Sequence, residues 1–197
     1  IEGKSVTSIR NEAFRGCTNL TSITIPSSIS SIGSGAFARC RSLTSITIPD
    51  SVTTIGSWAF AHCTSLTTIE IDAGNVNYTE VNGVLFNTEK TVLLTYPAGK
   101  TGDNYTIPDS VTSIGFSAFS GCRSLTSITI PDSVTSIGGS GFWYCTSLTS
   151  VTFLGNAPKA GEEVFRSATP TIYRKPDAKG WGDTFGGWPV KLIGEKP

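Results

Sequence analysis

Residues 107–131 read IPDSVTSIGFSAFSGCRSLTSITIP, and at Ile130 the chain begins the same pattern again. The step that leads from Ile107 to Ile130 also joins Phe119 to Phe142 and Cys122 to Cys145. A fixed period shared by several classes of apolar residue is the sequence signature of a solenoid, in which consecutive units stack on one another. The sequence therefore predicts one elongated repeat domain.

Each unit contains two short extended segments and one tight turn. Residues 125–130, LTSITI, alternate apolar with hydroxyl side chains, which is typical of a half-buried strand. Pro131 ends that strand because proline has no N–H to extend a ladder. Residues 134–138, VTSIG, predict a second extended segment, in which the glycine permits a bend. Residues 118–122, AFSGC, predict a single helical or 3-10 turn.

The charge and hydropathy of the chain argue against several classes of partner. Fifteen basic and fifteen acidic residues give a net charge of zero, which disfavours nucleic acid or an anionic membrane surface as the main partner. A membrane span requires about 18 consecutive apolar residues, and no apolar run in the chain is that long. No signal-peptide pattern opens the chain. Methionine is absent and Ile1 begins within a unit, so we expect a processed product or a fragment whose signal and anchor lie elsewhere.

The cysteines all occupy one position of the repeat. A zinc site is not expected, because no pair has C-x-x-C spacing and the chain has one histidine. Disulfides are not expected either, because equivalent residues of adjacent rungs stand about 4.8 Å apart with parallel side chains. We therefore predict a column of small buried thiols, formed by Cys17, Cys40, Cys63, Cys122 and Cys145.

The repeat register divides the predicted domain, residues 1–197, into four segments. Regular units occupy residues 1–71 and 107–153. The step from Ile71 to Ile107 is longer than the regular step from Ile48 to Ile71 by about half a unit, so residues 72–106 form an atypical β-rich insert. Within it we expect paired short strands that preserve the stack as one or two irregular rungs.

Residues 154–197 contain a degenerate last repeat and a tail rich in glycine and aromatic residues. The ends of a solenoid expose apolar rungs and require covering. We therefore interpret Trp181, Phe185 and Trp188 as a C-terminal cap. An aromatic platform for carbohydrate is the alternative interpretation of the same residues.

No set of residues in the sequence has the composition of a catalytic or metal site. His62 and Cys63 are adjacent, but adjacent side chains rarely face each other and Cys63 belongs to the predicted buried column. Asp50, Asp109 and Asp132 follow prolines and suit turns, and one aspartate per rung is too few for calcium. The repeat glycines mark the bends of the units, and no phosphate-loop pattern appears. We predict a non-enzymatic protein without cofactor or metal.

Two surfaces are candidates for partner binding. The outward positions of the strands form a face of serine and threonine that includes Thr47, Glu70 and Thr129. Such a face is typical of a soluble β surface, and it is also the long surface that solenoids use for binding. A regular threonine lattice that templates ice is a third interpretation, but Glu70, the serines and the insert interrupt it.

The second candidate surface surrounds the AFxxC turn, where large and charged residues concentrate. Arginine and aromatic residues are enriched in the hot spots of protein interfaces. Trp58 and Phe116 have the alternative role of filling space between rungs. The predicted partner-binding residues of this surface are Arg39, Arg41, Trp58, His62, Arg123, Trp143 and Tyr144, with Arg15 and Phe116 nearby.

The pattern C-x-S-L-T-S-I-x-I-P-x-S-V-T-x-I-G-x-x-A-F, residues 40–60, resembles the BspA-like leucine-rich repeat family. The insert resembles that family's NGVLF and LxxYP segments, here Asn82 to Phe86 and Leu93 to Pro97. The tail resembles its GWGxxF ending, here Gly180 to Phe185. The resemblance implies a right-handed α/β leucine-rich-repeat solenoid, dominated by short strands, without an enzymatic site.

The resemblance also implies a location and a function. Family members are extracellular or cell-surface proteins of anaerobic gut and oral bacteria and of some parasitic protists, associated with adhesion and recognition. We therefore expect a monomeric, bacterial, secreted or cell-surface module that binds a protein of the host matrix, of plasma or of a neighbouring cell. The alternative is a spacer or stalk within a larger surface protein.

Overall fold

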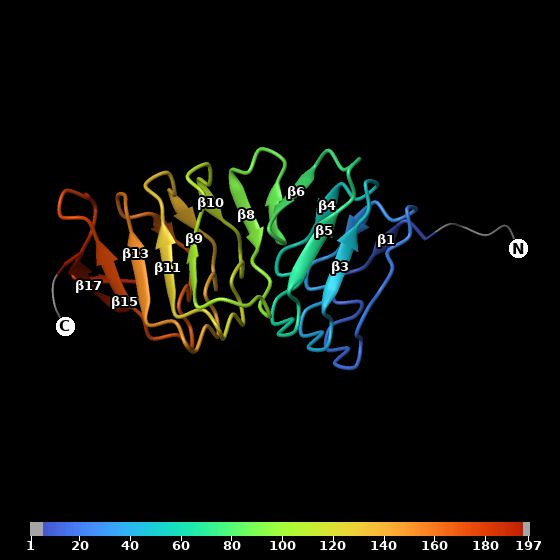
Figure 1. The fold of residues 1–197 in the computed structure, drawn as a ribbon, viewed down its shortest axis with the longest axis horizontal. Helices are drawn as coiled ribbons and strands as arrows, with labels where there is room; N and C mark the ends of the chain where they lie inside the picture. The colour runs from blue at the N-terminus through green and yellow to red at the C-terminus, as the bar shows by residue number, and fades with distance from the viewer. Residues whose placement is uncertain (1–5, 195–197) are drawn as a thin grey trace, which may run out of the picture.

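The computed structural model describes residues 6–194, which form a right-handed solenoid of about seven turns. The ends of the predicted domain, residues 1–5 and 195–197, lie outside the described residues. Figure 1 shows the rungs side by side along the long axis, with the two termini at opposite ends. Neighbouring regular rungs pair in parallel, each residue with its equivalent one repeat later, as Ser127 with Ser150 and Ser31 with Thr54. The predicted strand-dominated solenoid is confirmed.

One face carries the strands predicted from the LxxIxI pattern. They form two sheets, because β5 does not pair with β9. The first sheet is β3 (Ser45–Ile48) with β5 (Thr68–Ile71). The second contains β9 (Asn104–Thr106), β11 (Ser127–Ile130), β13 (Ser150–Phe153), β15 (Thr171–Arg174), β17 (Trp188–Leu192) and β16 (Thr184–Phe185), in that spatial order.

The opposite side carries the two-residue strands that precede the repeat glycine, together with the longer strands of the insert. They too form two sheets. The first is β1 (Ser8–Ile9), β2 (Ser31–Ile32) and β4 (Thr54–Ile55). The second contains β6 (Tyr78–Val81), β7 (Val84–Asn87), β8 (Val92–Thr95), β10 (Ser113–Ile114), β12 (Ser136–Ile137) and β14 (Lys159–Ala160).

The repeat glycine makes room for the neighbouring rung. A Cβ added to Gly33 would lie 2.4 Å from the backbone nitrogen of Asn11, and one added to Gly56 would lie 2.3 Å from that of Ser34. The backbones of successive rungs therefore meet at this position. Arg10, which replaces the glycine in the first unit, has no described rung in front of it.

The predicted helical or 3-10 turn does not form: the described residues contain no helix. The AFxxC segment is instead a chain of single β-turns in which successive N–H groups alternate between two kinds of acceptor. Ala36, Ala38 and Cys40 donate to the carbonyl three residues earlier, whereas Phe37 and Arg39 donate to carbonyls of the next rung. The alternation prevents consecutive i→i+3 bonds, so no helix propagates. We call this side of the solenoid, residues 11–18 and their equivalents, the turn edge.

Phenylalanines stack along the inside of the turn edge. The ring centroids of Phe14 and Phe37 are 5.3 Å apart, those of Phe119 and Phe142 5.0 Å, and those of Phe142 and Phe165 5.2 Å. In the insert Tyr96 takes the phenylalanine position and stacks on Phe119 at 5.2 Å. The fixed repeat period thus reproduces one apolar column rung after rung.

Four of the five cysteines form the predicted buried column, and the prediction is wrong for Cys17, which is exposed. The thiol of Cys63 donates to the carbonyl of Phe37 at 3.0 Å, and the thiol of Cys145 donates to that of Phe119 at 3.0 Å. No described rung precedes the rung of Cys17, so that thiol lacks the cover that its equivalents have.

The insert divides the hydrophobic core into two clusters. Strand β7 is buried on both sides: Leu85 belongs to the N-terminal cluster, whereas Val84 and Phe86 belong to the C-terminal one. Strands β6 and β7 are joined by a hairpin turn at Asn82 and Gly83, which both have positive φ. The antiparallel strands β6, β7 and β8 therefore stand between two parallel stacks.

The aromatic tail packs against the last rungs. Trp181, Phe185 and Trp188 are partly buried against the C-terminal cluster. The ring of Phe153 lies 4.9 Å from that of Trp181 and 5.2 Å from that of Phe185. These contacts place the three aromatic side chains against the C-terminal end of the core.

Candidate functional site

The insert brings two rungs that are distant in sequence into contact at the turn edge. In a regular pair Arg39 N–H donates to the carbonyl of Ala61 in the next unit of the sequence; His62 N–H donates instead to the carbonyl of Ser120 at 3.3 Å. Gly121 lies so close that an added Cβ would be 3.0 Å from His62 Nδ1. The insert has thus removed one rung from this part of the edge.

His62 is the centre of the resulting site. Its side chain is buried, and its Nε2 lies 3.1 Å from the hydroxyl of Ser120. The rings of Trp143 and Tyr144 meet it edge-on, with centroids at 4.7 and 5.4 Å. Arg166 lies over the Trp143 ring at 5.8 Å. The packing immobilises the imidazole between two rungs.

Three arginines surround the imidazole. Arg39, Arg41, His62, Arg123 and Tyr144 line a recess of about 200 Å³ that opens to solvent, which we call the arginine recess. Burial lowers the pKa of His62 from 6.5 to about 4, and the positive charges of Arg39, Arg123 and Arg41 add to that effect. His62 is therefore neutral at physiological pH and leaves the positive charge of the recess to the arginines.

A second hollow adjoins the recess and is mostly apolar. We call it the aromatic groove; it encloses about 360 Å³ and shares Arg39 and His62 with the recess. Its aromatic walls are Trp58, Phe116 and Trp143. The remaining lining residues are Arg15, Ala38, Ala61, Ser117 and Ser140.

Missing side chains on neighbouring rungs make space for the groove aromatics. Trp58 lies across Gly35, whose added Cβ would be 2.6 Å from the indole ring. Phe116 likewise lies over Gly139, whose added Cβ would be 2.9 Å from the phenyl ring. Phe116 is still 47% exposed. Both rings therefore pack on a neighbouring rung, and the phenyl ring also presents a wide face to solvent.

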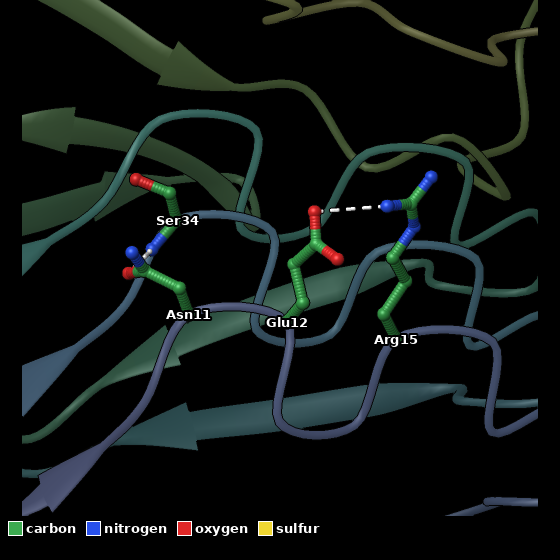
Figure 2. A network of polar contacts seen from close by, with 4 residues as sticks. All are labelled: Asn11, Glu12, Arg15 and Ser34. Carbon is green, nitrogen blue, oxygen red and sulfur yellow. Dashed lines mark hydrogen bonds and ion pairs between the residues drawn. The ribbon is translucent and has the colours of Figure 1, made fainter.

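An ion pair holds Arg15 in the wall of the groove, over the Trp58 ring. Its guanidinium lies 5.3 Å from the centre of the Trp58 ring, and its Nη1 is 2.8 Å from Glu12 Oε1. Figure 2 shows this pair, with the Asn11 side chain accepting a hydrogen bond of 2.9 Å from the Ser34 N–H beside it. Glu12 thus neutralises Arg15, whereas the three arginines of the recess have no such partner in the described part of the chain.

The backbone at the turn edge is left-handed at two positions of each rung, as at Trp58 and His62. Glycine occupies three of these positions, at 16, 35 and 121. Glutamate or serine occupies five others, and large side chains occupy the remaining four: Arg39, Trp58, His62 and Tyr144, with φ between 50° and 64°. Left-handed backbone is unfavourable for such residues.

The structure unites seven of the ten predicted binding residues and separates the other three. The seven residues of the turn edge line the recess or the groove. Thr47, Glu70 and Thr129 lie on β3, β5 and β11 and line neither hollow; the Thr47 hydroxyl donates to Glu70 Oε2 at 3.0 Å. Sequence reasoning missed Ser120, the partner of His62. The long step across the insert was the only signal for that contact.

The adjacent residues His62 and Cys63 do not form a nucleophilic pair. The Cys63 thiol is buried and donates to a backbone carbonyl, and burial raises its pKa to about 12. The imidazole faces Ser120 instead. Within residues 6–194 no three His, Cys, Asp or Glu side chains are grouped to hold a metal ion. Nor does that part of the chain contain a helix with the length and hydropathy to cross a bilayer.

Solved structures share this fold. A leucine-rich cell-surface protein from Faecalibacterium prausnitzii is 28% identical, with a TM-score of 0.68 over 85% of this chain and 51% of its own. A leucine-rich repeat protein from Eubacterium ventriosum is 27% identical, with a TM-score of 0.52 over 85% of this chain and 63% of its own. The pneumococcal vaccine antigen PcpA, at 22% identity and a TM-score of 0.67, covers 88% of this chain and 55% of its own and shows the fold alone.

The chain thus spans about half the length of PcpA and of the Faecalibacterium protein. No curated protein matches it. The model of the BspA-type leucine-rich repeat region matches residues 2–102 and 98–172 in six copies. The repeat, the insert and the stacked rungs agree with that match, and the chain belongs to the BspA-type leucine-rich repeat family.

Proposed function

We propose that the chain is a non-enzymatic, monomeric protein-binding module of a secreted or cell-surface protein, and that it binds its partner at the arginine recess and aromatic groove. One observation carries the proposal: Arg39, Trp58, His62 and Tyr144 occupy left-handed positions. A side chain at such a position costs about 1–2 kcal/mol. The left-handed backbone itself recurs in every regular rung, as at Ser117 and Glu163. It is the presence of large side chains there, in place of glycine or serine, that supports a functional site.

The composition of the two hollows supports the same proposal. Tryptophan, tyrosine and arginine supply much of the energy in protein interfaces, and here they gather on one edge with Phe116 and Tyr144 exposed. The similarity to a cell-surface protein supports an extracellular location. Proteins of the host matrix, of plasma or of neighbouring cells are the proposed class of partner.

A specific observation also favours the spacer function. Trp58 and Trp143 are partly buried, and they contact Gly35 and His62 of other rungs. In a spacer, the only role of the aromatic residues would be to fill space between rungs. Substitution of exposed side chains at the same edge is therefore a better test of recognition than substitution of these two tryptophans.

The test is binding of the purified chain to immobilised matrix and plasma proteins, compared with an Arg39→Gly/Tyr144→Gly variant. Both substitutions place glycine in a left-handed position, so the free energy of unfolding should stay equal or rise while binding falls at least tenfold. Lys90→Gly is the matched control, because Lys90 is exposed, charged and left-handed but lies outside the site. Absence of binding from the folded wild type, or equal binding by the variant, would favour the spacer.

A further inference from the structure

Among residues 6–194 the three arginines of the recess have no acidic partner, although the chain has equal numbers of acidic and basic residues. Arg15 and Arg166 are each paired with a glutamate three positions earlier. Arg39, Arg41 and Arg123 take part in no salt bridge within the described residues, and no carboxylate lines the recess or the groove. The charge of this recess is therefore left for a ligand to neutralise.

The chemistry of the recess selects a compact anion. Guanidinium groups present planar forks of donors that match carboxylates, and such charge-assisted hydrogen bonds are stronger than neutral ones. A volume of about 200 Å³ accommodates one or two carboxylates. The other lining groups, the imidazole of His62 and the exposed Tyr144, are neutral. A carboxylate of the ligand would therefore contact the arginines without competition from an acidic side chain of the recess.

The adjoining groove selects an apolar group on the same ligand. It is walled by Trp58, Phe116 and Trp143 and shares Arg39 and His62 with the recess, so a single short segment can reach both hollows. A volume of about 360 Å³ suits one large apolar side chain. Arginine and aromatic anchors side by side are typical of peptide recognition.

A polyanion such as a sulfated glycan or a nucleic acid fits this surface less well. Linear polyanions are bound by extended stripes of unpaired cations. Here the two further arginines of the edge, Arg15 and Arg166, are neutralised by Glu12 and Glu163. The positive surface is thus confined to one recess beside an apolar groove.

Deepening the proposed function and resting on it, we propose that the arginine recess and the aromatic groove together bind a peptide segment of a partner protein that presents two carboxylates beside a large apolar side chain. The carboxylates occupy the recess and the apolar side chain occupies the groove. Affinity then depends on both parts of the ligand and falls as salt concentration rises.

The test is calorimetric titration of the folded chain with a synthetic peptide that contains two glutamates followed by phenylalanine. Replacement of both glutamates by glutamine, or of phenylalanine by alanine, should each weaken binding about tenfold or more. Arg41→Gln and Arg123→Gln should weaken the parent peptide to the same degree. Phe116→Ser should lower affinity for it but leave the alanine peptide unchanged. Lys90→Gln, which removes a cation outside the site, should change nothing.

Three outcomes would overturn the inference: no binding of the peptide, equal binding of the glutamine peptide, or tighter binding of a heparin fragment that Arg123→Gln abolishes. These outcomes are separable from failure of the proposed function. If the chain binds an immobilised protein through Arg39 and Tyr144 but the peptide does not compete, the recognition surface stands and the ligand chemistry is wrong. If the peptide competes with that protein, both proposals stand.

Discussion

His62 and Ser120 lie 58 positions apart in the chain, and yet the imidazole Nε2 of His62 is 3.1 Å from the Ser120 hydroxyl. The contact joins the last regular rung before the insert to the first regular rung after it. Because the insert does not separate these rungs at the turn edge, the arginines on either side of it, Arg39 and Arg123, meet around one imidazole. The site therefore depends on the insert as much as on the repeats.

The first prediction concerns pH. The pKa of His62 is about 4 in the folded chain and near 6.5 when unfolded, so the unfolded state binds more protons between these values. The free energy of unfolding should therefore rise as pH increases from about 4 to 6.5, by on the order of 2 kcal/mol after allowance for solvent access. Urea denaturation across this range measures the slope.

The control for this prediction is His62→Asn, because asparagine tolerates the left-handed backbone at this position. The variant lacks the titrating group, so the difference between wild type and variant should flatten above pH 6.5. Ser120→Ala keeps the imidazole and should keep most of the slope. An identical slope in His62→Asn would show that other groups cause it.

The second prediction compares two repeat glycines. A Cβ at Gly138 would lie 2.6 Å from the backbone nitrogen of Phe116, whereas one at Gly115 would have its nearest contact at 3.1 Å, from the carbonyl oxygen of Leu93 in the atypical rung. Gly138→Ala should therefore lower the free energy of unfolding by about 1–3 kcal/mol through overpacking. Gly115→Ala should cost less than about 1 kcal/mol, because alanine also restricts the unfolded chain. Equal losses in urea denaturation would disprove close rung contact as the cause.

The third prediction concerns thiol reactivity. Cys17 is exposed, while burial raises the pKa of Cys63 to about 12 and that of Cys122 well above its ordinary value. Thiolate is the reactive species. Iodoacetamide should therefore modify one cysteine of the folded chain and all five after denaturation, as counted by mass spectrometry. Cys17→Ser should abolish the native modification; rapid labelling of a second thiol would contradict the buried column.

The fourth prediction concerns the two core clusters that meet at β7. Leu85 faces the N-terminal cluster and Phe86 the C-terminal one. Leu85→Ala, at a cost of about 2–5 kcal/mol, should accelerate amide exchange mainly in β3 and β5. Phe86→Ala, at about 3–5 kcal/mol, should act mainly on β8 and β10. If either substitution raised exchange evenly along the solenoid, the two clusters would behave as one cooperative unit.

Sequence reasoning was wrong at the AFxxC segment for a physical reason. Alanine, phenylalanine and cysteine at these spacings are compatible with a helical turn, and no local preference rules it out. The neighbouring rung supplies carbonyl acceptors for alternate N–H groups, as Ala59 does for Phe37 and Ala61 for Arg39. These bonds between rungs select alternating β-turns with left-handed residues, and they exist only after stacking.

The repeat period alone was enough to predict the structure of one rung. The fixed period placed the same apolar side chains inward at every step, so the parallel pairing, the phenylalanine column and most of the cysteine column followed from burial alone. Which rungs are neighbours at the turn edge, and which backbone conformations they adopt there, depend on contacts in the folded chain. The insert does not separate the flanking rungs there, so the His62 side chain contacts Ser120. Hydrogen bonds between rungs hold Arg39 and Tyr144 in left-handed conformations around the recess. Those relationships depend on contacts between residues far apart in the chain, which the spacing of the repeat does not encode.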